Sequence, residues 1–198
     1  MTTFNPYVVT NVQDGFSVQS QGYWQGDLLD DPAGRYQLSA GVVAATETLP
    51  MWGGIAVFEK TTANAVDGGA APLIGRAASA GEFAGFSVFN GSYSLPTTPQ
   101  SPVPMGSPGN SFNFVRAGTK NRVVVKAGTA ILALVGDTNP MTFGWDATAQ
   151  ELVASGAGDF DFDATLLAVT SNGATVTYDG VTGFATWNTT GTVAVILI

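Results

Sequence analysis

The sequence predicts an all-β protein, an antiparallel β-sandwich or barrel with an irregular N-terminal arm and a long proline-rich loop. Short runs of β-branched and aromatic residues recur at intervals of about ten residues, and glycine turns separate them. That spacing is typical of sandwiches and barrels. Residues 61–81 could hold a short helix, but no clear 3.6-residue apolar stripe supports one.

The chain divides into an arm at residues 1–36 and a β-rich body at 37–198. The arm carries large aromatic side chains among polar residues, so it is expected to dock on a neighbouring molecule or to form a first layer of the same domain. The body is a single unit or two β sub-domains, 37–90 and 112–198. Residues 91–111 would join the two and contain five of the ten prolines. Because proline cannot donate to a sheet, this segment is predicted to be a linker or a projecting contact loop.

Strands are predicted at 38–46, 54–60 and 82–90, where β-branched and aromatic residues lie between turn residues. Residues 121–137 predict a further hairpin. Its first strand contains Val123, Val124 and Val125, whose consecutive apolar side chains indicate a strand covered on both faces. Gly128 is expected to close the turn at positive φ, and a second strand would follow. With a similar pattern ten residues upstream, the segment predicts a three-stranded meander.

The last forty residues also indicate strands. Asp159, Asp161 and Asp163 alternate with phenylalanines, which predicts a half-exposed strand. An EF-hand calcium loop is excluded, because its sixth and twelfth positions would be Ala164 and Thr170 instead of glycine and glutamate. Turns are predicted at residues 179–180 and 190–191. The apolar C-terminal run is expected to lie inside a sheet or between subunits, because an unpaired apolar edge aggregates.

Charge and composition narrow the function classes. Charged residues make up 11% of the chain, against roughly 25% in an average soluble domain, so much of the surface is expected to face protein. The net charge is −8. Nucleic-acid binding needs clustered basic residues, and the one such cluster is better explained as a salt-bridging face. It comprises Arg116, Lys120, Arg122 and Lys126.

The chain has no cysteine and no histidine, which excludes most catalytic and metal-binding arrangements. Asp30 and Asp31 could serve as a carboxylate pair, but the following Pro32 makes turn chemistry the better interpretation. The protein is therefore predicted to be neither an enzyme nor dependent on a cofactor or metal. The start of the sequence lacks the features of a secretory signal, and no apolar run approaches the roughly 20 residues that span a bilayer, so a soluble product made in the cytoplasm is expected.

Residues 22–36, followed by Glu-Thr-Leu-Pro-Met-Trp-Gly-Gly at 47–54, resemble a group of tailed-phage head proteins described as structural or cement proteins. The Val-Lys-Ala-Gly-Thr-Ala-Ile string at 125–131 resembles the strand-turn-strand element of small β cement proteins. The resemblance implies a capsid decoration protein without catalytic residues. Such a protein is often trimeric, binds the major capsid protein on the outside of the head, and is part of the virion.

On this interpretation the contacts with the capsid would come from aromatic residues of the arm and from the proline-rich loop. The expected contact residues are Phe4, Tyr7, Tyr23, Trp24, Pro96, Pro99, Pro102 and Pro104. Two other classes remain open. A glycan-binding β-module, or a fibre or tail structural protein, would use exposed rings as stacking platforms, and a hydrolase that relies on carboxylates would need two acids at a fixed separation.

Overall fold

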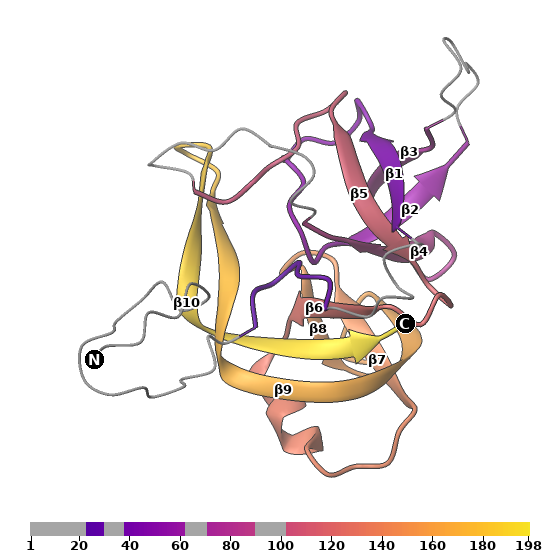
Figure 1. Ribbon diagram of the computed structural model, residues 1–198, viewed down its shortest axis with the longest axis vertical. Coiled ribbons are helices and arrows are strands. Elements are labelled where there is room, and N and C mark those ends of the chain that lie inside the picture. The colour runs from indigo at the N-terminus through magenta and orange to yellow at the C-terminus, as the bar shows by residue number, and fades with distance from the viewer. Residues whose placement is uncertain (1–22, 30–37, 62–70, 90–101) are drawn as a thin grey trace, which may run out of the picture.

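The computed structural model describes residues 23–29, 38–61, 71–89 and 102–198 (Figure 1). Within these ranges the chain forms β-strands and one 3-10 helix, so the all-β prediction is confirmed. The strands form two units, a closed five-stranded barrel and a second five-stranded sheet. In Figure 1 the barrel lies above the second sheet, and one long hairpin runs past both.

The first half of the described chain forms the barrel. Its strands are β1 (Leu38–Val43), β2 (Ala56–Lys60), β3 (Leu73–Arg76), β4 (Phe83–Ser87) and β5 (Ser111–Arg116). Their order is β1-β3-β2-β4-β5, and β5 closes the barrel by pairing with β1. The pairing of β1 with β3 is parallel, and the other pairs are antiparallel. The described part of residues 61–81, a candidate region for a short helix, contains strand β3 and no helix.

The second half forms the other sheet, in the order β6-β10-β9-β7-β8. Its elements are β6 (Arg122–Lys126), η3 (Thr129–Leu134), β7 (Met141–Asp146), β8 (Glu151–Ala154), β9 (Phe160–Asp179) and β10 (Phe184–Leu197). The two ends of this sheet approach each other, because Ala127 bridges Leu152 and the N–H of Gly128 donates to the carbonyl of Leu152 at 2.8 Å. The chain passes from one unit to the other between β5 and β6.

Strands β9 and β10 form a hairpin that takes part in both units. The lower half of β10 lies between β6 and β9, which confirms that the apolar C-terminal run lies inside a sheet. The upper half leans against the barrel, where Val176 and Ala185 join its core. In β9 the side chains of Phe160 and Phe162 are buried and Asp161 is exposed, as their alternation predicts.

The turn predicted at residues 190–191 is wrong, because β10 continues through it. The register shifts on both sides of Gly191, which pairs with Gly173 of β9. A Cβ at Gly191 would lie 2.3 Å from the Thr175 side chain, and one at Gly173 would lie 2.2 Å from Val193. The two glycines therefore let the strands approach closely at an irregularity within the hairpin, and they do not reverse the chain.

The predicted hairpin at 121–137 is correct in its first strand and wrong in its second. Val123, Val124 and Val125 are all fully buried in β6, as expected of a strand covered on both faces. Residues 129–134 instead form the 3-10 helix η3, which buries Ile131. Gly128 has an extended backbone, with φ of −67° and ψ of 151°, because its N–H continues the contact with β8. The three-stranded meander is also wrong, since β5 and β6 belong to different sheets.

One hydrophobic cluster contains residues of both the barrel and the second sheet, and Phe86 of β4 belongs to it. Phe86 is fully buried, and its ring centroid lies 5.1 Å from that of Trp145 on β7 and 5.6 Å from that of Phe162 on β9. The preceding Gly85 has φ of +152°, and a Cβ there would lie 1.9 Å from the carbonyl oxygen of Val115. The glycine thus permits the close approach of β4 and β5 beside the ring that joins the two units.

Replacing Phe86 by alanine is expected to destabilise the whole protein by about 3–5 kcal/mol, because it empties the shared core. Equilibrium unfolding in urea, followed by tryptophan fluorescence and by circular dichroism, measures this change. The same substitution at Phe184, which is 42% exposed, is the matched control and should cost less than about 1 kcal/mol. Two separate unfolding transitions in the wild-type protein would contradict a shared core.

Candidate functional site

Eight ionisable groups of the described residues form four ion pairs. Four glutamates lie in ion pairs, which are Lys60–Glu82, Arg76–Glu47, Arg116–Glu59 and Lys126–Glu151. In the described part of the chain, no group of three or more acidic residues, histidines or cysteines is arranged to hold a metal ion. Nor does a helix of that part have the length and apolarity to cross a membrane. Asp30 and Asp31 lie outside the described residues.

Exposed apolar side chains are the more distinctive feature, and one group of them lies at the tip of the β9–β10 hairpin. We call this the tip surface and define it by Leu49, Pro108, Val181 and Phe184. Leu49 is 41% exposed, Phe184 42% and Val181 96%, although all three are large and apolar. Leu49 and Pro108 line a shallow cleft of about 340 Å³ together with Gly183 of the hairpin turn.

The turn that carries Val181 is held by the carboxylate of Asp179. The backbone N–H of Val181 donates to it at 2.9 Å, and the hydroxyl of Thr182 donates at 2.7 Å. These two contacts, with that of Thr182 the larger, hold the pKa of Asp179 below its usual value. The N–H of Gly183 also donates to the Asp179 carbonyl at 2.8 Å. Val181 is therefore an apolar side chain on a well-bonded turn, and it projects into solvent.

The other half of the tip surface is fixed by Arg76 of the barrel. Its guanidinium pairs with Glu47 at 2.9 Å and donates to the carbonyls of Leu49 at 3.1 Å and Pro50 at 2.6 Å. Burial lowers the pKa of Arg76, and the contact with Glu47 counteracts that effect. The guanidinium also lies 5.1 Å above the ring of Trp52, which stacks on Tyr178 of β9 at 5.7 Å. This stack connects the loop that carries Leu49 to the hairpin.

The proline-rich segment reaches the same end of the molecule. Pro102 is exposed and Pro104 is partly buried, while Val103 between them is fully buried. Met51 and Gly106 exchange two backbone hydrogen bonds of 2.8 Å, which attach this segment to the loop before β2. Pro96 and Pro99 lie outside the described residues. Sequence pattern alone does not single out Leu49, Val181 or Phe184. The one signal in the sequence is an apolar residue, Val181, directly after the Asp-Gly turn at residues 179–180.

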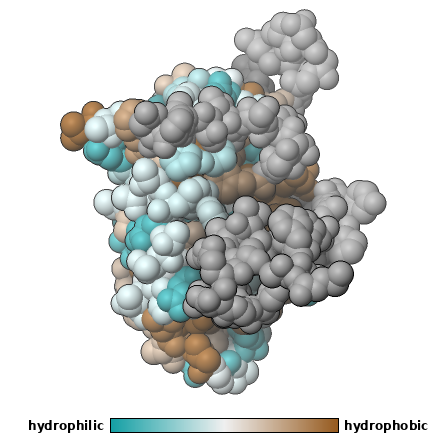
Figure 2. Space-filling view, turned by 60° about the vertical axis from the view of Figure 1, so that its left-hand side comes forward, coloured by the Kyte–Doolittle hydropathy of each residue, from teal (hydrophilic) through white to brown (hydrophobic). Residues whose placement is uncertain are grey.

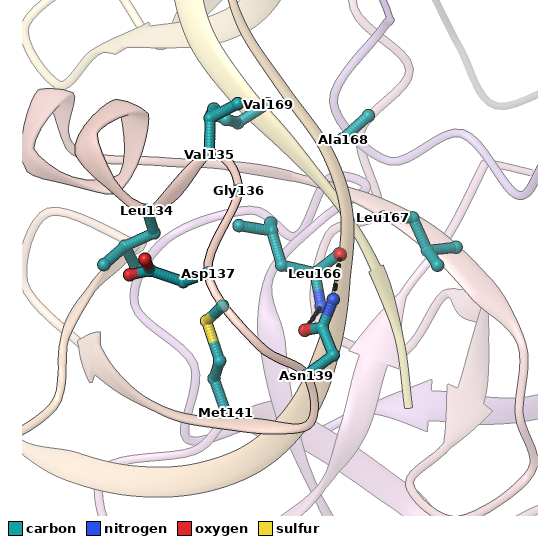
Figure 3. Close-up of a pocket in the computed structure, with 10 residues that line it drawn as sticks. All are labelled: Leu134, Val135, Gly136, Asp137, Asn139, Met141, Leu166, Leu167, Ala168 and Val169. Carbon is teal, nitrogen blue, oxygen red and sulfur yellow. Dashed lines mark hydrogen bonds between the residues drawn. The ribbon is translucent and has the colours of Figure 1, made fainter.

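A second apolar surface lies at the opposite end, between β9 and the loop that follows η3. Figure 2 shows hydrophobic residues gathered at this lower end of the molecule. A cleft of about 240 Å³ opens there, which we call the lower cleft. Figure 3 shows its lining, which consists of Leu134, Val135, Gly136, Asp137, Asn139, Met141, Leu166, Leu167, Ala168 and Val169. Val135 is 69% exposed and Leu167 46%.

Residues 23–29 of the predicted arm lie against the chain's own second sheet. Gln25 and Gly26 donate to the carbonyls of Ala174 and Val124, both at 2.8 Å, and the side chain of Gln25 accepts from the N–H of Val176 at 2.9 Å. For these residues the first-layer interpretation of the arm is correct. Gly26 has φ of +86°, and a Cβ there would lie 2.5 Å from the Cα of Gly53, so glycine permits this docking.

Tyr23 and Trp24 are each 38% exposed. The ring of Trp24 contacts the ring of Trp187 edge to face at 4.7 Å, so part of this side chain already packs within the molecule. The arm residues Phe4 and Tyr7 lie outside the described residues. Tyr23 and Trp24 therefore do not form one continuous surface with the described prolines. Of the described residues, the tip surface is the best-defined exposed apolar group.

Asp27, in the docked segment, has an unusual electrostatic environment. Burial raises the pKa of its carboxyl from 3.8 to about 6, although the backbone N–H of Trp24 acts in the opposite direction. At pH above 6 the carboxylate is charged in both the folded and the unfolded state, and its desolvation costs free energy only in the folded state. As the pH falls from 6 towards 4, the folded state takes up the proton first. The contribution of Asp27 therefore makes the protein more stable as the pH falls through this window.

The substitution Asp27→Asn is expected to stabilise the protein at pH 7.5 by about 1–2 kcal/mol, a figure that allows for solvent screening at this partly buried site. The gain should disappear near pH 4, because the wild-type carboxyl is then neutral in the folded state. Urea unfolding between pH 4 and pH 8 measures it. Asp161→Asn is a control of opposite sign, since the N–H of Gly156 and the hydroxyl of Ser155 lower the pKa of Asp161. A gain for Asp27→Asn that does not vary with pH would contradict this account.

Comparison with known proteins adds no relative of this chain. No protein-family model, no curated protein and no solved structure matches it. The likeness to phage head proteins therefore remains a resemblance in sequence strings, and the function has to be argued from the two surfaces and the scaffold that holds them.

Proposed function

We propose that this protein is a structural protein of a tailed-phage virion, a capsid decoration or cement protein that binds the outside of the head and stabilises it. Its partners are the major capsid protein and further copies of itself, with which it forms a trimer. It is made in the cytoplasm of the bacterial host and has no catalytic role. The observation that carries the proposal is the tip surface, an exposed apolar group on a rigid support.

The tip surface has the properties that concentrate binding energy in protein interfaces. Large apolar side chains that become desolvated at the centre of a contact usually dominate its affinity. Val181 and Phe184 are presented on a hydrogen-bonded turn, and Leu49 on a loop fixed by Arg76. Because little order has to be gained on binding, more of the interaction energy remains as affinity.

The charges support a protein partner rather than a nucleic acid. Within the basic cluster, Arg116 pairs with Glu59 at 2.6 Å and Lys126 pairs with Glu151 at 3.0 Å. Only part of the cluster's positive charge is thus available to phosphates, and the whole chain carries a net charge of −8. An acidic, charge-poor protein gains little from counterion release on DNA.

Several copies in one oligomer would strengthen a weak contact. Binding of the first copy raises the effective concentration of the others, so a trimer can bind a capsid tightly through three modest surfaces. A ligand that binds assembled shells in preference to free subunits then stabilises the shell by mass action. This is the physical basis on which such a protein would protect a head from heat.

The exposure of Tyr23 and Trp24, 38% each, favours one alternative, a glycan-binding module or fibre protein that stacks sugars on these rings. A glycan array with the purified protein separates the two functions. Binding to a sugar that is lost in Trp24→Ala would support the alternative, whereas sedimentation of the wild-type protein with heads, without binding to any sugar, supports the capsid proposal.

The substitution Val181→Asp is expected to reduce binding to heads at least about tenfold, because it places a charge at the centre of the desolvated contact. Co-sedimentation with heads of the encoding phage, and their melting temperature, measure the effect. Val135→Asp, at the opposite end and 69% exposed, is the matched control and should bind like the wild type. Unchanged binding of Val181→Asp would rule out the tip surface as the contact, and a wild-type protein that never sediments with heads would end the capsid proposal.

A further inference from the structure

The edge of β9 that faces away from β10 is paired at both ends and open in the middle. At its start, β7 pairs with β9 from Phe160 to Ala164. Near its end, Trp24 bridges Ala174. Between these contacts no strand of the described ranges pairs with this edge, and the side chain of Asn139 bonds to Leu166, so the open part comprises residues 167–173. An open edge next to an apolar cleft is a site at which an extended segment can add to a sheet.

Asn139 shows what this edge can bind. Its side-chain amide donates to the carbonyl of Leu166 at 2.8 Å and accepts from the N–H of Leu166 at 2.9 Å (Figure 3). These are the two bonds that a neighbouring strand would make with Leu166. Beyond it the edge continues past the lower cleft, where Leu167 is 46% exposed.

The chain itself arrives at this edge in the direction needed to continue along it. The N–H of Ala174 donates to the carbonyl of Tyr23 at 3.0 Å, and the N–H of Gln25 donates to the carbonyl of Ala174 at 2.8 Å. The bridge between Trp24 and Ala174 is parallel. In a parallel pair both strands run the same way, so the residues before Tyr23 would continue back along β9 towards Leu166.

The length and sequence of that segment fit the open edge. Eight residues cover roughly 26 Å as a strand, and 22 residues precede Tyr23 in the chain. Residues 15–22 read Gly-Phe-Ser-Val-Gln-Ser-Gln-Gly, in which apolar Phe16 and Val18 alternate with polar residues. This is the pattern of a half-buried strand. The segment has no charge, which suits an edge beside an apolar cleft.

We propose that the open edge of β9 is the binding site of residues 15–22 of the same chain, which add a parallel strand to the second sheet and cover the side of the lower cleft. The addition removes an exposed strand edge from the molecule. The inference does not depend on the proposed function, since it concerns the isolated protein.

Because the chain has no cysteine, introduced cysteine pairs give an unambiguous test. The offset of the Trp24–Ala174 bridge places Val18 near Ala168 and Ser20 near Thr170, to within the one-residue shifts that β9 shows against β10 in this stretch. The full-length variants Val18→Cys with Ala168→Cys and Ser20→Cys with Thr170→Cys are oxidised mildly and analysed by non-reducing electrophoresis and peptide mass spectrometry. The control joins Val18→Cys to Thr186→Cys, an exposed position on β10.

The expected result is a disulfide within one chain for at least one of the two edge pairs, with a yield about tenfold above that of the control. Equal yields for edge and control pairs, or no disulfide in either edge pair, would overturn the proposal and leave the register shifts of β9 as the protection of this edge. Disulfides found between chains would overturn it as well, because the occupant would then be the arm of a second copy. Since no head enters the experiment, either outcome leaves the capsid proposal to its own test.

Discussion

The fold depends on the continuity of the β9–β10 hairpin, because this one element contributes to all three hydrophobic clusters of the described residues. At its lower end Leu166 and Ile196 contribute to the cluster that contains Phe86, and at its upper end Val176 and Ala185 contribute to the interior of the barrel. A hairpin of this length would not be stable as an isolated ribbon. The cluster around Phe86 holds the lower half of the hairpin, and the interior of the barrel holds the upper half. The hairpin in turn fixes how these two cores are oriented relative to each other.

This constraint connects the fold to the proposed contact. The tip surface lies at the far end of the hairpin, where a free ribbon would be most mobile. Here the stack of Arg76, Trp52 and Tyr178 attaches β9 to the barrel just below the turn. The carboxylate of Asp179 then orders the turn itself. An apolar group is thereby kept in one position without being buried, and a binding surface of this kind needs both properties.

The sequence was sufficient for the features that depend on local pattern. The all-β class, the doubly covered strand at residues 123–125 and the alternation around Phe160 and Phe162 follow from side-chain periodicity. Periodicity could not distinguish a strand from a 3-10 helix at residues 129–134, because only one side chain of this segment, Ile131, is buried. Nor could it show that the glycines at 173 and 191 mark an irregularity inside a hairpin, because their role depends on a partner strand.

The candidate site was harder to predict for the same reason. Exposure of Val181 or Leu49 is a property of the assembled molecule, and in the sequence both resemble ordinary core residues. Tyr23 and Trp24 were selected as arm residues, and the local sequence gave no indication that Gly26 and Gly53 would bring this segment onto the second sheet. Of the predicted contact elements, the proline-rich loop comes nearest to the tip surface. Its described part begins at Pro102, a few residues before those that line the shallow cleft beside Leu49.

Native-state hydrogen exchange at single-residue resolution tests most directly whether one hairpin is held by both cores. The account predicts that the hydrogen-bonded amides of the upper hairpin, at residues 175–178 and 185–188, exchange with the same free energy of opening as those at 194–196, so that both exchange only on global unfolding. The dependence of this free energy of opening on denaturant concentration should also be the same for the two groups of amides. Rapid exchange of the upper hairpin by local opening, with the lower half still protected, would contradict the account, because the tip surface would then lack a rigid support.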